Sequence, residues 1–357
     1  VFGKKVAVDS TSLKMYDGQI TVLLGHNGAG KTTTMSMLTG FIPPTSGTAE
    51  VNGCDIRNNI QGVRESLGLC PQHDILFDTL TVQEHLQFFA KLKGCHGSRM
   101  EAEVMSTVKE VGLETKLNAL SQSLSGGQKR KLSVGIALIG GSKVVVLDEP
   151  TAGMDPAARR QTWNVLQNAR KGRTVLLSTH YMDEADLLGD RIAIMAEGVI
   201  KCCGTSLFLK KLYGAGYHLV VVKRSDCNVD TLTKVVKSHI PTAELESIIN
   251  TEVSYILPDS ESAQFPTLFT ELDDQKKELG ITSFGTSATT MEEVFLKAVP
   301  LLGGLPRQFA RRSEESTSSK TILAALLFIP QLLTLSSRVP DRGAKWVFDL
   351  AQGSPTG

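Results

Sequence analysis

The chain has 357 residues, a formal net charge of +1 and 41% hydrophobic residues. A chain of this length has room for about two domains, each with its own core. The near-neutral charge gives no electrostatic reason to expect a nucleic acid partner. The six cysteines form no C-x-x-C pair, so we expect reduced thiols rather than a disulfide framework or a zinc site.

No charged and then apolar leader opens the sequence, so we expect no secretory signal, and the start at Val1 indicates a piece of a longer polypeptide. The longest apolar run, residues 322–335, is shorter than the roughly 18 residues that a membrane helix needs, and Pro330 interrupts it. We therefore expect no transmembrane helix.

The stretch at 25–33, GHNGAGKTT, follows an apolar run at 20–24 and precedes residues with helical spacing, which predicts a strand, a glycine-rich turn and a helix. Glycines allow successive N–H groups to point inward, so the turn fits a polyphosphate at a helix N-terminus. The pattern matches GxxxxGK[ST]; a glycine-rich surface turn is the competing interpretation. We expect Lys31 to reach the β- and γ-phosphates and the Thr32 hydroxyl to ligate Mg²⁺. The other expected phosphate-binding residues are Gly25, His26, Asn27, Gly28, Ala29, Gly30 and Thr33.

The elements that follow combine a hairpin with helices. A strand at 48–51 enters a turn at Asn52-Gly53, and a short strand is expected at 67–69. Helical spacing and a capping box of Thr81 and Glu84 predict a helix at 81–92, and another helix is expected at 99–111. We expect these helices to form an inserted helical subdomain over about 73–140.

Strands and helices alternate in the second half of this domain. A helix runs from the stretch at 124–128 (LSGGQ) through Leu138, and further helices are expected at 156–167 and 182–188. Strands are expected at 143–147, 174–178 and 191–195. This alternation predicts an α/β fold of the P-loop NTPase type, with a parallel sheet and helices on its faces.

Two adjacent carboxylates, Asp148 and Glu149, follow the apolar strand at 143–147. Ligands of an open α/β sheet bind at the carboxyl ends of its strands, where the turn at 25–33 should also lie. We expect Asp148 to bind Mg²⁺ and Glu149 to polarise the attacking water, although solvated loop acids are the default for such a pair taken alone. The turn at 125–127 could also bind phosphate through backbone N–H groups, but such a turn is more often a simple N-cap.

The pattern changes beyond residue 214. Strands at 217–222, 252–257 and 281–284, with helices at 229–239, 265–279 and 291–296, predict a β-α-β-α-β order and a small ferredoxin-like α+β domain. We therefore divide the chain into domains at 1–214 and 215–298 and a tail at 299–357. Residues 301–320 predict a linker. The apolar run beyond them could be an amphipathic helix, a membrane-interface anchor or sequence foreign to the parent protein.

Six motifs occur in one order along the chain: 25–32, Gln72, 124–128, 144–149, 152–155 and His180. In this order they resemble the ATP-binding cassette (ABC) family, and the resemblance covers about residues 4–212. The family implies a head-to-tail pair of cassettes, in which each ATP lies between the glycine-rich loop of one cassette and the LSGGQ turn of the other. The residues that would contact the partner's ATP are Ser125, Gly126, Gly127 and Gln128.

The same resemblance implies roles for single residues. Catalysis would involve Glu149, with His180 and Gln72 near the γ-phosphate, and Gln72 would lie beside the coupling surface to a transmembrane domain. Asp155 would cross to the partner cassette. The implied Mg²⁺ ligands are Thr32, Gln72 and Asp148. A solvated glutamine and a capping or packing histidine are the alternatives for Gln72 and His180.

Longer stretches, among them GGSKVVVLDEPTAGMDP and LSTHYMDEADLLGDRIAI, are similar to subfamily A lipid exporters, in particular to their first cassette. Residues 217–297 resemble the small regulatory domain of that subfamily. The resemblance implies an ATPase that uses Mg-ATP and powers lipid transport by pairing with a second cassette. We expect that cassette in the same parent polypeptide, together with transmembrane domains outside this chain.

The resemblance further implies a place on the cytoplasmic face of a membrane, weak turnover by this fragment alone and no nucleic acid partner. Two alternatives belong to other classes. One is a soluble ABC-type ATPase that acts on nucleic acid or ribosomes. The other is an ATP-gated switch module whose hydrolysis is incidental.

Overall fold

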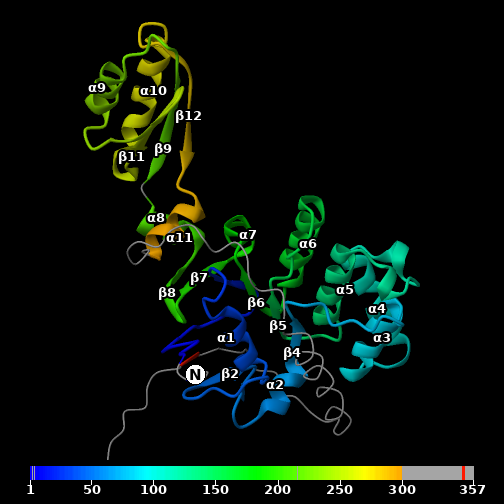
Figure 1. The fold of residues 1–357 in the computed structure, drawn as a ribbon. Helices are drawn as coiled ribbons and strands as arrows, with labels where there is room; N and C mark the ends of the chain where they lie inside the picture. Colours follow the sequence, from blue (N-terminus) through cyan, green and yellow to red (C-terminus); the bar gives the residue numbers. More distant parts are fainter. Residues whose placement is uncertain (2, 4, 215, 300–347, 350–357) are drawn as a thin grey trace, which may run out of the picture. The chain divides into compact units, whose positions relative to one another are not determined.

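The computed structural model describes residues 1, 3, 5–214, 216–299 and 348–349. The chain divides into two compact units, one beginning at Val1 and running to Thr205 and the other beginning at Ser206 (Figure 1). The sequence placed this boundary at 214. The difference arises because α8 (Ser206–Tyr213) packs against α11 (Met291–Ala298) of the second unit.

Most of the expected tail, including the linker at 301–320 and the apolar run at 322–335, lies outside the described residues. Within the described part, no helix has both the length and the apolar character that crossing a membrane requires. All six cysteines are free thiols, as the sequence predicted.

A six-stranded sheet forms the centre of the first unit, in the order β4-β5-β6-β1-β7-β8. Neighbouring strands from β4 to β7 are parallel, and β8 pairs antiparallel with β7. β1 and β5 are buried along their whole length, which is typical of strands covered on both faces. The strands are β1 (Ile20–Leu24), β4 (Leu67–Cys70), β5 (Val144–Asp148), β6 (Thr174–Thr179), β7 (Arg191–Ala196) and β8 (Val199–Gly204). The expected strands are confirmed with small shifts at their ends, and β8 is additional.

Four helices of the first unit follow strands of this sheet or of the hairpin: α1 (Lys31–Leu38), α2 (Ile60–Ser66), α6 (Pro156–Ala169) and α7 (Met182–Leu188). Met35 and Leu38 of α1 share a core with Leu23 and Val146 of the sheet. The expected hairpin is confirmed: Asn52 and Gly53 both have positive φ between β2 (Thr48–Val51) and β3 (Cys54–Asp55). β13 (Phe348–Asp349) pairs antiparallel with β2.

The helical insert consists of α3 (Val82–Leu92), α4 (Gly97–Val111) and α5 (Gly126–Leu138), with short 3₁₀ turns at Glu114–Lys116 and Ser121–Ser123. These helices lie together to one side of the strands (Figure 1). They bury a core of their own, which includes Leu86, Val104 and Leu132. The capping box of Thr81 and Glu84 at the start of α3 is present as predicted.

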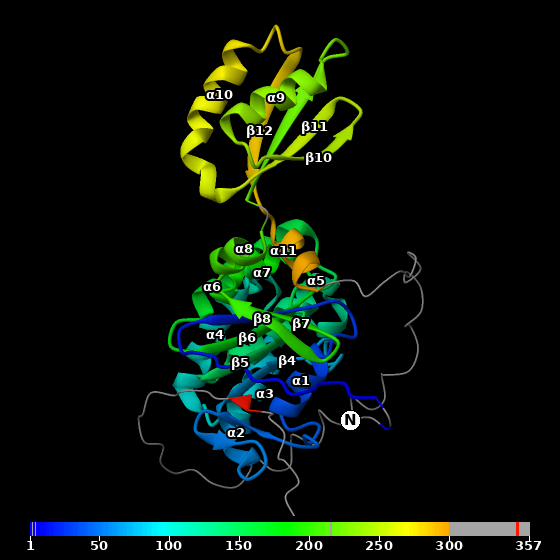
Figure 2. The ribbon, with the colours of Figure 1, turned by 90° about the vertical axis from the view of Figure 1, so that its left-hand side faces the viewer.

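The second unit has a four-stranded antiparallel sheet in the order β10-β11-β9-β12. Its elements are β9 (Tyr217–Lys223), α9 (Val229–His239), β10 (Glu244–Ile249), β11 (Glu252–Leu257), α10 (Phe265–Asp274) and β12 (Ile281–Ala288). α9 and α10 lie side by side on one face of the sheet (Figure 2). The chain order is therefore β-α-β-β-α-β, and the expected β-α-β-α-β order was wrong because it lacked β10. The strands β9 and β10, joined by α9, flank β11, which is the split arrangement that the sequence predicted.

The strands of the first unit also bring three loops to one edge of the sheet. In the parallel register Leu24 pairs with Thr179, and Asp148 pairs with Ser178. The chain segments that leave β1, β5 and β6 therefore begin at the same level, at the carboxyl ends of these strands. Ligands bind at this edge in open α/β sheets.

Candidate functional site

The loop between β1 and α1 has a backbone that requires glycine at two points. Gly30 is the N-cap of α1 with a φ of +106°, and a Cβ there would lie 2.6 Å from the carbonyl oxygen of Ala7. A Cβ at Gly25 would lie 2.5 Å from the carbonyl oxygen of Met195. No side chain caps the first turn of α1, so its N–H groups remain available for an anion.

Other residues of the loop face outward. His26, Asn27, Gly28 and Thr32 are exposed, and a Cβ placed at Gly28 would meet no atom within 4 Å. Ala29 is buried, and Thr33 is half-buried. The loop is therefore anchored at Gly25 and Gly30 and open between them, as a phosphate cradle has to be.

The Lys31 ammonium group folds back over this loop. Its Nζ donates hydrogen bonds to the carbonyl oxygens of Gly25 at 2.8 Å and His26 at 3.2 Å, and it lies 3.8 Å from Oε1 of Glu149. Burial lowers the pKa of Lys31, and the carboxylates of Glu149 and Asp148 oppose this effect. A cation held by backbone carbonyls at a cradle can exchange them for phosphate oxygens, which are stronger acceptors.

Glu149 occupies the centre of the site. Its Oε1 lies 3.1 Å from Nδ1 of His180, and its Oε2 accepts a hydrogen bond from Nε2 of Gln72 at 3.4 Å. Together with Lys31, these contacts bring four predicted site residues together. They come from the segments that leave β1, β4, β5 and β6.

The backbone of Glu149 is strained. Its φ of +49° lies in the left-handed region, which non-glycine residues rarely adopt. The Glu149 N–H donates to the carbonyl oxygen of Ser178 at 3.2 Å and to its Oγ at 3.0 Å. The Ser178 hydroxyl in turn donates to Oδ1 of Asp148. Strain of this kind is typical of functional sites.

Arg130 supports the site and was not predicted. It is 2% exposed, and its guanidinium donates to the carbonyl oxygens of Pro71, Asp148 and Glu149 and to Oδ1 of Asp74 at 3.0 Å. Spacing did not single it out in the sequence, because Lys129 and Lys131 belong to the same basic run and α5 is buried over most of its length. Arg130 links the segment after β4 to the segment after β5.

The predicted residues of the LSGGQ turn do not join this cluster. Ser125 caps α5, with the backbone N–H of Gln128 donating to Ser125 Oγ and the Gln128 side chain accepting from the Ser125 N–H. Ser125 and Gly126 are exposed, and Gly127 and Gln128 are half-buried. The turn is therefore a well-formed N-cap whose outer surface is accessible.

Asp155 is the N-cap of α6 and accepts hydrogen bonds from the N–H groups of Ala157 and Ala158, both at 3.0 Å. The N–H donors of Ala158 and Ala157 lower the pKa of this exposed carboxyl group. Its hydrogen bonds stay within its own turn.

The side chains of Thr32, Gln72 and Asp148 offer a hydroxyl, an amide and a carboxylate oxygen. Oxygen ligands of this kind suit Mg²⁺, which often keeps waters and is bound through one or two protein groups and substrate phosphates. Within the described residues, no group of three or more His, Cys, Asp and Glu side chains could hold a metal ion without such help. The donor set therefore fits a magnesium ion that arrives with a nucleotide.

Two family models match the chain. Residues 8–152 match the model described as "ABC transporter", and residues 217–291 match the model described as "ACT-like domain". The first match includes the glycine-rich loop, the LSGGQ turn and the Asp148-Glu149 pair. The second falls on the α+β sheet of the second unit.

Curated relatives are similar over most of this chain. The human protein named "Phospholipid-transporting ATPase ABCA3" is 57% identical over 298 residues, which are 84% of this chain and 18% of the relative. "ATP-binding cassette sub-family A member 17" of Rattus norvegicus is 53% identical, covering 84% of this chain and 17% of that protein. The bovine "Retinal-specific phospholipid-transporting ATPase ABCA4" is 45% identical, covering 82% and 14%. The chain therefore spans less than a fifth of the length of these relatives.

Solved structures show the same fold. "Structure of ATP binding subunit of ABC transporter" aligns with a TM-score of 0.56 and 25% identity over 65% of this chain and 94% of that one. A structure of cbiO1 from Clostridium perfringens aligns with a TM-score of 0.53 and 29% identity over 57% and 85%. The dimer titled as a post-hydrolysis state of the ATP-binding cassette MJ0796 with ADP and Pi has a TM-score of 0.53 and 22% identity over 57% and 94%, and supports the fold alone.

Proposed function

This chain belongs to the ABC transporter family, and on that premise we propose that it binds ATP with Mg²⁺ and hydrolyses it when it pairs with a second cassette. The single observation that carries the proposal is the convergence on the Glu149 carboxylate of Lys31, Gln72 and His180 from three other segments. The Glu149 base, the Lys31 cation and two hydrogen-bonding side chains therefore lie beside the open loop between β1 and α1.

Each of these residues has a role in the proposal. Lys31 exchanges the carbonyl oxygens of Gly25 and His26 for the β- and γ-phosphate oxygens of the nucleotide. Glu149 orients the attacking water and acts as the general base that accepts its proton. His180 and Gln72 hold that carboxylate from either side and face the γ-phosphate.

Thr32, Gln72 and Asp148 would hold the magnesium ion. When bound, the ion would supply positive charge that offsets the negative charge developing on the transferred phosphoryl group. Asp148 is oriented for this role by the Ser178 hydroxyl, which donates to its Oδ1. The exposed Thr32 hydroxyl at the start of α1 lies directly after Lys31.

We propose that the LSGGQ turn and Asp155 of this chain act on the second cassette and its nucleotide. Their hydrogen bonds stay within their own turns and leave the outer surface of each turn accessible. Ser125, Gly126, Gly127 and Gln128 would contact the nucleotide of the second cassette, and Asp155 would reach across to it. Each chain thus supplies one half of each of two sites.

The transport role follows from the relatives, two of which are named phospholipid-transporting ATPases. We propose that this chain powers lipid movement through transmembrane domains outside residues 1–357, with Gln72 near the coupling surface and the cassette on the cytoplasmic face of the membrane. The second cassette would lie in the same polypeptide. We propose that the first unit is the nucleotide-binding domain, with its insert at about 73–140, and that the second unit, which begins at Ser206 and includes residues 215–298, is a regulatory domain.

Turnover measured against protein concentration tests the proposal. Because each site needs two cassettes, specific activity should rise with concentration, while ATP binding is retained in dilute solution. High turnover that is independent of concentration would contradict the paired site. Absence of nucleotide binding would overturn the function altogether.

Two alternatives make different predictions. A soluble ATPase that acts on nucleic acid or ribosomes would show turnover stimulated by RNA or DNA, which the similarity to phospholipid transporters does not favour. A switch module with incidental hydrolysis would support transport in the full-length protein even when Glu149 is replaced by Gln. We expect neither result.

A further inference from the structure

Glu184 is a fully buried carboxylate in the first unit that the proposed mechanism does not use. It lies in the first turn of α7 and is 0% exposed. Its Oε1 accepts two hydrogen bonds, from the Thr151 hydroxyl at 2.8 Å and from the indole N–H of Trp163 at 2.9 Å. One oxygen atom therefore joins three separate segments of the chain.

Each of these segments carries a residue of the proposed site. Thr151, which is also fully buried, lies two residues after Glu149 in the segment that follows β5. Trp163 belongs to α6, whose N-cap is Asp155. Glu184 itself lies one helical turn beyond His180. The Oε1 atom thus connects three parts of the chain: the segment after Glu149, the segment that contains His180, and α6, which follows Asp155.

A second contact joins the same elements. The ring of Tyr181 lies 4.2 Å from the His180 ring between centroids, and the Arg159 guanidinium lies 4.1 Å from the centre of the Tyr181 ring. Arg159 stands one turn before Trp163 on α6. Both ends of the segment from His180 to Glu184 are therefore tied to α6.

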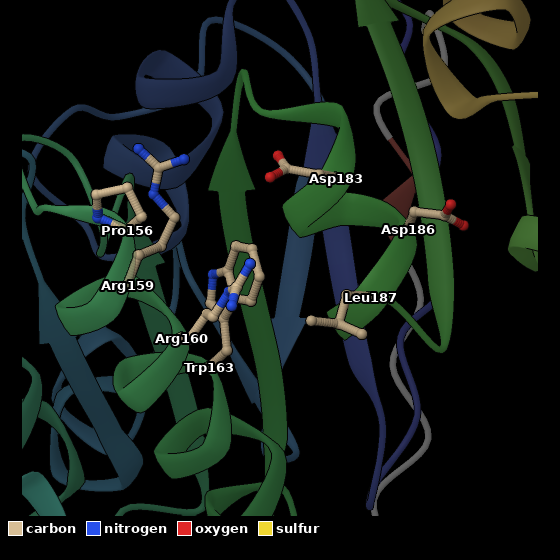
Figure 3. Close-up of a pocket in the computed structure, with 7 residues that line it drawn as sticks. All are labelled: Pro156, Arg159, Arg160, Trp163, Asp183, Asp186 and Leu187. Atoms are coloured by element: carbon tan, nitrogen blue, oxygen red, sulfur yellow. The ribbon is translucent and has the colours of Figure 1, made fainter.

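A surface pocket separates the outer side chains of α6 and α7. An open pocket of about 520 Å³ lies between them and is lined by Arg159 and Trp163 on α6 and Asp183 and Asp186 on α7, among others (Figure 3). Figure 3 shows the α6 side chains and the α7 side chains on opposite walls of this space. The contacts of Glu184 with Trp163 and of Tyr181 with Arg159 join the two helices beside this space.

Burial of a carboxylate at position 184 is energetically unfavourable. Burial raises the pKa of Glu184, and the neighbouring Thr179, Thr151 and Trp163 side chains, with the charge of Arg159, oppose that rise. Apolar residues of similar volume often stabilise a protein as well as a buried polar network does. What the network adds is a fixed geometry, because its hydrogen bonds are directional.

We propose that Glu184 is a positioning residue for hydrolysis, which holds His180 and Glu149 in register with the helix that starts at Asp155. When the partner cassette moves Asp155, α6 carries His180 and the segment after Glu149 with it through Trp163 and Thr151. This inference rests on the proposed ATPase function. It concerns the placement of groups, because Glu184 is fully buried and acts through Thr151 and Trp163.

The test removes each donor and leaves the carboxylate in place, in the full chain. Thr151→Val replaces the hydroxyl by a methyl group of similar size, and Trp163→Phe removes the indole N–H but keeps an aromatic ring. Thr39→Val is the matched control, because Thr39 is 1% exposed and donates through its hydroxyl to the carbonyl oxygen of Met35 at 2.9 Å, outside this network. Turnover, nucleotide Kd and amide hydrogen exchange are measured for all variants.

Because misplaced catalytic groups lose rate, we expect kcat to fall about tenfold or more in Thr151→Val and Trp163→Phe. The Kd for ATP should stay within about twofold of the unchanged protein, since the cradle is intact. Without nucleotide, exchange should accelerate locally in peptides that cover 149–155 and 179–188. Thr39→Val should show normal kcat and no acceleration in these two peptides.

Three outcomes are decisive. Unchanged kcat and unchanged local exchange in both variants, with normal turnover by the unchanged protein, would overturn the inference and leave the proposed function standing. A uniform rise in exchange, with kcat lowered only in proportion to the folded fraction, would show that Glu184 merely stabilises the fold. If the unchanged protein neither binds nor hydrolyses ATP, the proposed function fails, and the local exchange data alone decide whether the network holds the three segments together.

Discussion

Nδ1 of His180 lies 3.1 Å from Oε1 of Glu149, and the two residues leave neighbouring parallel strands, β6 and β5, at the same edge of the sheet. Glu149 reaches this position only with a left-handed backbone. The contact orients the carboxylate toward the loop that holds Lys31.

Replacing Glu149 with Gln should abolish turnover and preserve ATP binding. Glutamine has the same shape and can still contact His180, but it cannot accept a proton from water. Because the nucleotide then persists, the variant should accumulate as a closed pair in the presence of Mg-ATP, which size-exclusion chromatography detects. Normal turnover by Glu149→Gln would place the base elsewhere.

Replacing Lys31 with Met should weaken ATP binding about tenfold to a hundredfold. This range corresponds to the loss of charged hydrogen bonds worth about 1.5–3 kcal/mol. Titration with a fluorescent ATP analogue measures the change. Lys171→Met, at an exposed position just after α6, is the control and should bind normally. Equal affinity of both variants would remove Lys31 from the phosphate site.

Replacing Arg130 with Met should destabilise the first unit by about 3 kcal/mol, because it leaves the Asp74 carboxylate without its cation and buried carbonyl groups without their donor. Urea unfolding followed by Trp163 fluorescence measures the loss. The adjacent Lys129→Met should change the free energy of unfolding by less than about 0.5 kcal/mol, as surface substitutions usually do. Similar losses in both variants would indicate a general effect of charge on α5.

The second unit should become less stable as the pH rises above neutrality. Burial disfavours the charge on His218, but hydrogen bonds to Glu246 at 2.9 Å and Glu293 at 2.7 Å, with the charges of both carboxylates, raise its pKa overall. Stabilisation by a raised histidine pKa is complete below the unfolded value of about 6.5 and is lost as the pH rises through the folded value.

Glu293 limits the stability of the second unit at low pH. Burial alone would raise its pKa, but hydrogen bonds from His218 and Thr290 lower it, so its contribution is present above the unfolded value of about 4.3 and is lost as the pH falls through the folded value. Hydrogen exchange of peptides covering β9 and α11, corrected for the intrinsic rate, should therefore show greatest protection between about pH 4.5 and 6.5. His218→Gln should flatten the alkaline side, and an unchanged slope in that variant would contradict the assignment.

Local patterns predicted the site because its chemistry is concentrated at the ends of buried strands. The apolar runs of β1 and β5 are continuous, and residues of the candidate site lie at the carboxyl end of each. Since parallel strands of one sheet align their carboxyl ends, the meeting of Lys31 and Glu149 could be inferred without coordinates.

The two strands that the sequence did not predict, β8 and β10, lack such a pattern. β10 is an edge strand that is exposed along most of its length, and β8 is half-buried along most of its length, so neither shows the burial alternation that identifies a strand. α10 ends at Asp274 rather than 279 because the chain turns there and reaches Gly280 at a φ of +67°. These features depend on neighbours rather than on local propensity.

Arg130 and Glu184 could not have been assigned from the sequence for a different reason. Both act through groups that are distant in the chain, and Arg130 binds mainly backbone carbonyl oxygens, which every residue possesses. The motif LSGGQ marks the start of α5 without indicating which of the following basic residues points inward. Only the packing of α5 against β4 and β5 decides this.

At residue 149 the left-handed backbone favours glycine for stability, whereas the proposed catalysis requires a carboxylate. Glycine would adopt this conformation at no steric cost, so a sequence selected for stability alone would lose the carboxylate. Laboratory selection of heat-resistant cassettes from this chain should therefore enrich inactive variants at residue 149 unless activity is selected at the same time.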